Sequence, residues 1–323
     1  PSGMVDTTDA VFAFVAAALI TWALVPVAEK LARRVGAIDE PGPRSQHTVS
    51  TPRMSGIALL IGIQVAGWIW LPHNTETSSI LLGAVAITLV GALDDVFDLP
   101  AMVKLLGQIA AAVIPVAGGV HPDVLTIPFV GGFELGWTAW PLTVLGIVAV
   151  VNVINLIDGI DGLAAGVCFI AATAMAAIAL SLDRTEAGIL AALTAGGALG
   201  FLRHGFPPAT SFMGDAGSNL LGYMIAVASI QGALKTNAVV ALAFPLVILA
   251  VPILDTAFVV AKRIKYKQPI YQADRWHFHH RMANLGFSQR RTLAYLYGCC
   301  LLYTSDAADE SSRGVGGVGG VGG

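Results

Sequence analysis

The chain of 323 residues is 55% hydrophobic and only 12% charged, with a net charge of −3 and a mean hydropathy of +0.74. This composition excludes an ordinary soluble domain and indicates an integral membrane protein. We expect membrane lipid around the chain and no nucleic-acid partner.

Apolar segments long enough to cross about 30 Å of hydrocarbon recur along the whole chain. The ten candidates are residues 10–28, 55–72, 79–97, 102–120, 138–157, 162–182, 187–202, 218–234, 238–261 and 291–303. The last is too short to cross, and the first lacks the basic flank of a cleaved signal peptide, so we expect it to remain as an anchor. The predicted fold class is all-α: one polytopic bundle of about ten spans, forming a single domain over residues 1–302.

Alternating these spans across the membrane divides the loops into two sets. Fifteen Lys and Arg residues fall in or beside 29–54, 98–104, 158–161, 203–217 and 262–291, against two, Arg184 and Lys235, on the other side. Cytoplasmic loops carry an excess of Lys and Arg, so the first set is predicted to be cytoplasmic. Every polar motif described below lies on that side.

Two segments depart from the helical pattern. Short β-like runs around Gly131 and Gly132 predict a small β-hairpin on the outer surface over residues 124–136. After about Leu302 the chain turns polar and then Gly-rich. We expect residues 303–323 to be a low-complexity or non-native tail that interrupts the tenth span.

Adjacent carboxylates close the third span. Asp94 and Asp95 directly continue its apolar helix, Asp98 follows, and Lys104 lies at the start of the next span. Neighbouring carboxylates repel, so a divalent ion or an amine is expected close by. The alternative is a solvated acidic loop.

Amides and carboxylates at intervals of three close the fifth span, at Asn152, Asn155, Asp158 and Asp161. If the helix continues to Asp158, this spacing keeps the first three near one face. Polar groups at the end of a membrane helix are costly and indicate a functional site. The alternative, a polar helix end in water, needs only one capping residue.

A lone carboxylate flanked by glycines precedes the eighth span, in Gly214-Asp215-Ala216-Gly217-Ser218. Glycines let a ligand approach closely, and a helix start offers free N–H groups to an anion. Carboxylates and amides at several helix ends suit Mg²⁺, which takes one or two protein carboxylates and completes its shell with phosphate and water. The alternative is that Asp215 only caps the helix.

The most polar loop contains His277-Phe278-His279-His280-Arg281. Zinc is an alternative, but no cysteine is nearby, and His beside Arg is better suited to holding phosphate or pyrophosphate. The first loop adds Arg44 and His47 and, beyond them, Pro52-Arg53. Ligands for a hard cation beside a basic cradle for phosphates are what phosphoryl transfer requires.

Four motifs, Asp94-Asp95, Asn152-x-x-Asn155-x-x-Asp158-Gly-x-Asp161-Gly, Met213-Gly-Asp215-x-Gly-Ser218 and His277-x-His279-His280-Arg281, occur in that order. In residues and spacing the chain resembles the polyprenyl-phosphate N-acetylhexosamine-1-phosphate transferases over about residues 10–300. The resemblance implies a magnesium-dependent enzyme of the bacterial inner membrane, with Mn²⁺ as an alternative metal. Such an enzyme moves a sugar 1-phosphate from a UDP-sugar to undecaprenyl phosphate and releases UMP, with its active site at the cytoplasmic face.

The resemblance also assigns roles to residues. The metal ligands are Asp215, the principal one, and Asn155. The catalytic residues are Asp94, Asp95, Asp158 and His279. Substrate binding falls to Lys104, Asn152, Asp161, which is placed near the uracil, His277, His280, Arg281, Arg44 and His47. For Asp94 and Asp95 we favour positioning over proton removal, because a phosphate monoester with a second pKa of about 6 is already mostly dianionic at neutral pH.

The interrupted histidine run favours the branch that takes UDP-GlcNAc for teichoic acid, lipopolysaccharide O-antigen or related cell-wall glycans. The peptidoglycan branch, which takes UDP-MurNAc-pentapeptide, is the alternative. A polytopic transporter would place ionisable groups at mid-membrane and repeat its halves, and an intramembrane aspartyl protease would leave the basic loop unexplained. A homodimer is an alternative to a monomer.

Overall fold

The computed structural model describes residues 7–39, 50–122, 124–127, 131–234, 262, 263, 265 and 287–316. Helices dominate this part of the chain. They are α1 (Thr7–Val35), α2 (Gly56–Trp70), α3 (Thr75–Phe97), α4 (Ala101–Ala117), α5 (Ala139–Ile157), α6 (Leu163–Ser181), α7 (Thr185–Gly205), α8 (Gly214–Leu234) and α12 (Gln289–Gly316), with a short 3₁₀ turn, η1 (Gly136–Thr138), before α5.

Each of the first eight predicted spans coincides with one of these helices, and the ninth, 238–261, lies outside the described residues. Five described stretches are long and apolar enough to cross a membrane: α1, α3, Gly136–Ile157, α6 and α7. Their outward faces carry large apolar side chains such as Phe12, Leu82 and Leu145, each more than half exposed. The protein is therefore a helical membrane protein whose surface is suited to lipid.

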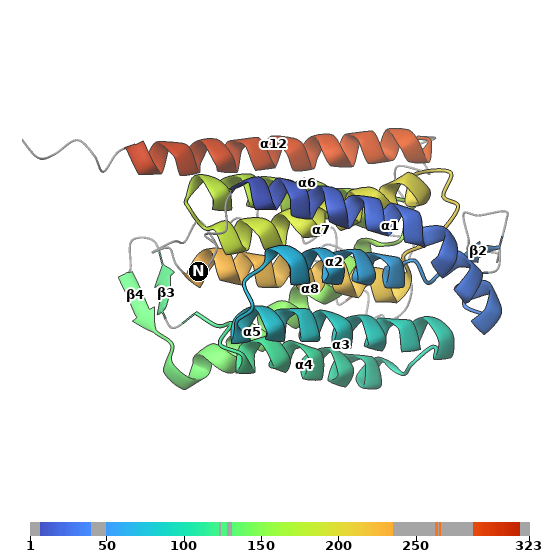
Figure 1. Cartoon of the computed structure of the whole chain (residues 1–323), viewed down its shortest axis with the longest axis horizontal. Coiled ribbons are helices and arrows are strands. Elements are labelled where there is room, and N and C mark those ends of the chain that lie inside the picture. Colours follow the sequence, from blue (N-terminus) through green and yellow to red (C-terminus); the bar gives the residue numbers. More distant parts are fainter. Residues whose placement is uncertain are drawn as a thin grey trace, which may run out of the picture.

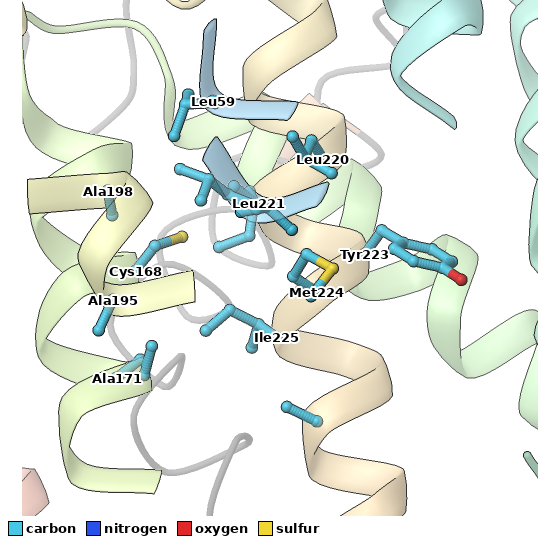
Figure 2. Packing of buried hydrophobic residues seen from close by; sticks show 14 of the residues in the cluster. Leu59, Cys168, Ala171, Ala195, Ala198, Leu220, Leu221, Tyr223, Met224 and Ile225 are labelled. Atoms are coloured by element: carbon cyan, nitrogen blue, oxygen red, sulfur yellow. The ribbon is translucent and has the colours of Figure 1, made fainter. Parts of the chain in front are cut away.

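Helix α8 lies at the centre of the bundle, where it contacts α2, α3, α5, α6 and α7. Leu221 and Ile225 project from it toward small residues of α6 and α7, including Ala171 and Ala195, whereas Leu220 lies on the side nearer Tyr223 (Figure 2). Small side chains let membrane helices approach closely, which packs α8 tightly. On the side facing α3, the buried Tyr223 hydroxyl donates to the Ile80 carbonyl at 2.9 Å.

Two small antiparallel strand pairs lie at opposite ends of the bundle (Figure 1). One pairs β1 (Ile38–Asp39) with β2 (Thr51–Pro52), which the sequence analysis did not anticipate. The other pairs β3 (Val124–Ile127) with β4 (Gly131–Glu134) where the hairpin was predicted. Its two glycines belong to β4 and do not form the turn, because Gly131 pairs with Ile127 and Gly132 with Thr126.

Helix α12 runs alongside α6 (Figure 1) and continues to Gly316. The predicted tenth span, 291–303, ends too early, whereas the interpretation of 303–323 as a low-complexity or non-native tail stays a prediction. Residues 303–313 contain neither Gly nor Pro, so no strong helix breaker occurs before the glycine-rich end.

Candidate active site

Four helices bring polar side chains together at the end of the bundle that carries β2. Asp94 and Asp95 lie in the last turn of α3, Lys104 in the first turn of α4, Asn155 in the last turn of α5 and Asp215 in the first turn of α8. These residues are up to 121 positions apart in the sequence, yet hydrogen bonds and ion pairs connect all of them. The end of the bundle thus forms one polar cluster.

Lys104 is the cation beside the acidic pair. Its ammonium lies 2.9 Å from a carboxylate oxygen of Asp94 and also pairs with Asp215. The amine predicted near Asp94 and Asp95 is therefore confirmed. The other oxygen of Asp94 accepts the Leu99 backbone N–H at 2.8 Å, which fixes the carboxylate over the end of its own helix.

Asp95 points toward the start of α8 instead. Its two carboxylate oxygens accept the backbone N–H groups of Asp215, at 2.8 Å, and Ala216, at 3.0 Å. Helix starts have unpaired N–H groups and a partial positive charge, both of which a carboxylate satisfies. Asp95 therefore caps α8 from a neighbouring helix, while the Asp215 side chain stays turned toward Lys104 and Asn155.

Asn155 connects α5 to this arrangement. Its amide nitrogen donates to Asp215 Oδ1 and to Ser218 Oγ, both at 2.9 Å, and its carbonyl oxygen lies 3.4 Å from Lys104 Nζ. The Asp215 carboxylate is thus held from two sides, by an amide and by an ammonium. This fixed geometry is what a preorganised electrostatic site requires.

Close backbone contacts set the position of the α8 start. A Cβ added at Gly91 would overlap the backbone of Asp215, and one added at Gly56 would overlap the backbone of Gly217. Gly214 has φ of +67°, and a side chain there would collide with the Arg53 carbonyl and the Asp95 carboxylate. Only glycine fits these positions without displacing the site.

A pocket of about 260 Å³ opens beside the cluster. Its charged and amide lining residues are Arg53, Asp95, Asn155, Asp158, Asp161 and Asp215. Asp161 is buried, and its Oδ2 accepts the Ala209 N–H at 3.1 Å. Asp158 follows the last residue of α5, where burial and the negative charges of Asp215, Asp95 and Asp161 raise its pKa well above the ordinary value.

Helix α12 holds two of the loops that line this pocket. The Tyr297 hydroxyl donates to the Gly162 carbonyl at 2.6 Å, next to Asp161, and Arg290 Nε donates to the Pro207 carbonyl at 3.1 Å.

Asn152 occupies a different position from the other predicted site residues. It lies on the outer side of α5, does not line the pocket, and donates to Gln108 of α4 at 2.7 Å. Arg44, His47, His277, His279, His280 and Arg281 lie outside the described residues. Sequence reasoning missed Arg53, which lines the pocket and belongs to the basic first loop but was assigned no role. It also missed Gln108, the partner of Asn152 outside the pocket, which gave no signal because it is a single polar residue in an apolar helix.

The donor set fits a hard divalent cation. Within the described residues there is no group of three or more His, Cys, Asp or Glu placed to hold a metal ion. Mg²⁺, however, usually takes one or two protein carboxylates and fills its remaining positions with substrate phosphates and water. The Asp215 carboxylate and the Asn155 amide, both at the pocket wall, provide that smaller set; in this structure the Asn155 nitrogen faces Asp215 and its carbonyl oxygen lies 3.4 Å from Lys104 Nζ.

Comparison with known proteins agrees with the motifs. Residues 47–233 match glycosyl transferase family 4. The chain is 42% identical to the probable undecaprenyl-phosphate N-acetylglucosaminyl 1-phosphate transferase of Bacillus subtilis, over an alignment that covers 89% of this chain and 81% of that protein. Over 87% of its length it is 35% identical to 78% of the decaprenyl-phosphate N-acetylglucosaminephosphotransferase of Mycobacterium leprae. Over 88% of its length it is 33% identical to 91% of the phospho-N-acetylmuramoyl-pentapeptide-transferase of Desulforamulus reducens.

The helical bundle and its polar cluster define a membrane-embedded transferase. The chain belongs to glycosyl transferase family 4 and, within it, to the polyprenyl-phosphate N-acetylhexosamine-1-phosphate transferases that its motifs resemble.

Proposed function

We propose that this protein transfers N-acetylglucosamine 1-phosphate from UDP-GlcNAc to undecaprenyl phosphate and releases UMP. The names of the Bacillus and Mycobacterium relatives, an undecaprenyl-phosphate and a decaprenyl-phosphate N-acetylglucosamine phosphotransferase, support this donor and a polyprenyl-phosphate acceptor. The observation that carries the proposal is the convergence of Asp94, Asp95, Lys104, Asn155 and Asp215 at one end of four apolar helices. There a lipid phosphate and a water-soluble nucleotide can meet.

In the proposed reaction an oxygen of the acceptor phosphate attacks the phosphorus that carries the sugar. A new P–O–P bond forms, the bond to the UMP oxygen breaks, and UMP leaves with that electron pair. No proton has to be removed from a dianionic acceptor. The protein's task is positioning and neutralising charge, which the fixed Asp94–Lys104–Asp215 arrangement suits.

Mg²⁺, with Mn²⁺ as an alternative, is part of the proposal. Asp215 and Asn155 would hold it, and when bound it would neutralise negative charge on the diphosphate. Lys104 would contact the acceptor phosphate beside it. We further place the site at the cytoplasmic face of the bacterial inner membrane, because fifteen Lys and Arg residues lie in or beside the loops of that side. The product would serve cell-envelope glycan synthesis, such as teichoic acid or O-antigen.

The test is direct transfer by the purified full chain. The protein is incubated with magnesium, undecaprenyl phosphate and either labelled UDP-GlcNAc or labelled UDP-MurNAc-pentapeptide, the donor suggested by the Desulforamulus relative. We expect UMP and a labelled lipid pyrophosphate from UDP-GlcNAc. Transfer only from the pentapeptide donor would replace the proposed donor, and transfer from neither by folded protein would reject the proposal.

For the metal, we expect EDTA to abolish turnover and added magnesium to restore it. Asp215→Ala should lower kcat by at least about a hundredfold, which is typical for the loss of a preorganised charge. Asp98→Asn, at an exposed carboxylate beyond the end of α3, is the matched control and should keep wild-type turnover.

A further inference from the structure

Arg53 lies just before the start of α2, and hydrogen bonds hold the backbone on both sides of it. Its N–H donates to the Ala37 carbonyl at 3.1 Å, and its carbonyl lies against Gly214. The flanking Pro52 carbonyl accepts the Phe212 N–H at 2.9 Å, and Ser55 N–H donates to the Phe212 carbonyl at 3.2 Å. Residues 52–55 and 212–214 thus form a rigid unit that carries the Arg53 side chain at the pocket wall.

The pocket is strongly acidic apart from this residue. Among its described lining residues, four are carboxylates and Arg53 is the one cationic side chain. Lys104, the other described cation near the site, does not line the pocket and pairs with Asp94 and Asp215. An anionic ligand entering such a pocket meets repulsion unless positive charge faces it. A guanidinium can offer two parallel N–H groups to a phosphate.

The two cations face different surroundings. On α4, Met102, Val103 and Leu106 are 65%, 50% and 60% exposed and form an apolar flank suited to lipid, whereas the Lys104 ammonium faces inward to Asp94 and Asp215. Arg53 instead belongs to the loop region beyond the helices, beside the β1–β2 pair. A lipid chain suits the apolar flank, so we assign the acceptor phosphate to that side and the water-soluble donor to the loop side.

We propose that Arg53 is a donor-binding residue that contacts the diphosphate of the UDP-sugar. This inference rests on the proposed function for the identity of the donor. It assigns a different cation to each substrate: Arg53 contacts the nucleotide diphosphate, and Lys104 lies where the acceptor phosphate arrives. Arg53 thereby offsets the repulsion between the diphosphate and the pocket carboxylates.

The experiment compares Arg53→Gln and Arg53→Lys with the wild type in the full chain. Arg34→Gln, at an exposed arginine in the last turn of α1, removes the same charge elsewhere and is the matched control. Dissociation constants for UDP and for uridine are measured by calorimetric titration with saturating magnesium, and KM for UDP-GlcNAc and for undecaprenyl phosphate by UMP release.

For Arg53→Gln we expect the UDP dissociation constant and the donor KM to rise about 10- to 100-fold, the loss expected for hydrogen bonds to a charged group. The uridine dissociation constant and the acceptor KM should change less than about twofold, because neither involves the donor diphosphate. For Arg53→Lys, the UDP dissociation constant and the donor KM should lie between those of the wild type and Arg53→Gln, because lysine keeps the charge but lacks the two parallel N–H groups of the guanidinium. Arg34→Gln should match the wild type.

Three results would overturn the inference. They are an unchanged UDP dissociation constant, an equal loss of UDP and uridine binding, and a rise confined to the acceptor KM. Failure of the proposed function is a separate outcome: a wild-type protein that binds UDP through Arg53 but transfers no sugar phosphate would reject the reaction and keep the contact.

Discussion

The carboxylates of Asp94 and Asp95 both have fixed partners. Asp94 pairs with Lys104 and accepts the Leu99 N–H, and Asp95 accepts two N–H groups at the start of α8. A general base needs a lone pair directed at the proton that it removes. In this arrangement both residues hold other groups in place, which favours a positioning role over proton removal.

Asp94→Asn and Asp95→Asn test this role through the pH dependence of turnover. We expect each variant to lose at least about tenfold in rate, because an amide replaces one charged acceptor by a donor. The loss should be the same across pH 5.5 to 8.5, a range that includes the second pKa of a phosphate monoester, about 6. A loss concentrated at acid pH, where the acceptor carries a proton, would instead identify a base.

Asp158 gives a prediction about stability. Its pKa is raised in the folded protein, so the folded state holds the proton more tightly than the unfolded chain, whose pKa is about 4. Stability from this group is complete below that value and is lost as pH rises through the folded pKa. Asp158→Asn keeps the side chain neutral, so in EDTA its Tm should exceed the wild-type Tm at pH 8 and approach it at pH 5.

The measurement is thermal unfolding of the purified protein in detergent. Asp98→Asn is the control, because that carboxylate is exposed and does not line the pocket. A Tm advantage of Asp158→Asn that is the same at both pH values would show that the ionisation of the buried Asp158 carboxyl is not its cause.

At the scale of elements, direct backbone contacts with α2 and α3 position the start of α8. Gly91 of α3 and Gly56 of α2 touch the backbone of residues 215–217 with no side chain between them. Adding a methyl group at either position should move α8 relative to α3 or α2. Such overpacking costs about 1–3 kcal/mol, and it would shift Asp215 against Lys104 and Asn155.

We therefore expect Gly91→Ala and Gly56→Ala to lower both Tm and the rate of UMP release. Gly146→Ala is the matched control, because an added Cβ there meets nothing within 4 Å. Alanine is the better helix former by up to about 1 kcal/mol, so this variant should keep its activity and its Tm should not fall. Wild-type activity in Gly91→Ala would contradict the close approach of α3 and α8.

Hydropathy predicted the helices well because membrane crossing fixes their length and apolar character. It could not say which side chains would meet. A step of three residues turns about 60° short of a full circle on a helix of 3.6 residues per turn, so Asn152 faces Gln108 while Asn155 faces Asp215. The capping of α8 by Asp95 depends on how α3 and α8 pack against each other, which cannot be predicted from residue spacing along the chain.

For the whole molecule, the site and the β3–β4 hairpin lie at opposite ends of the bundle (Figure 1). The excess of Lys and Arg predicts that the site end faces the cytoplasm. Single cysteines test this in a Cys299→Ser background, since Cys168 and Cys300 are buried. In intact cells, an impermeant maleimide should label Trp137→Cys, next to the hairpin, and should label Asp98→Cys only after permeabilisation. The reverse pattern would place the site on the outer face.

The burial of α8 has a practical consequence. Its first turn forms part of the pocket wall, and its remaining turns are the centre of the packed core. A nucleotide that binds this turn therefore stabilises the same helix on which the packed core depends, and so opposes thermal unfolding. A ligand at a hundred times its dissociation constant stabilises a protein by about 2.7 kcal/mol. Melting curves of the detergent-solubilised enzyme can thus rank inhibitors of the donor site without any lipid substrate.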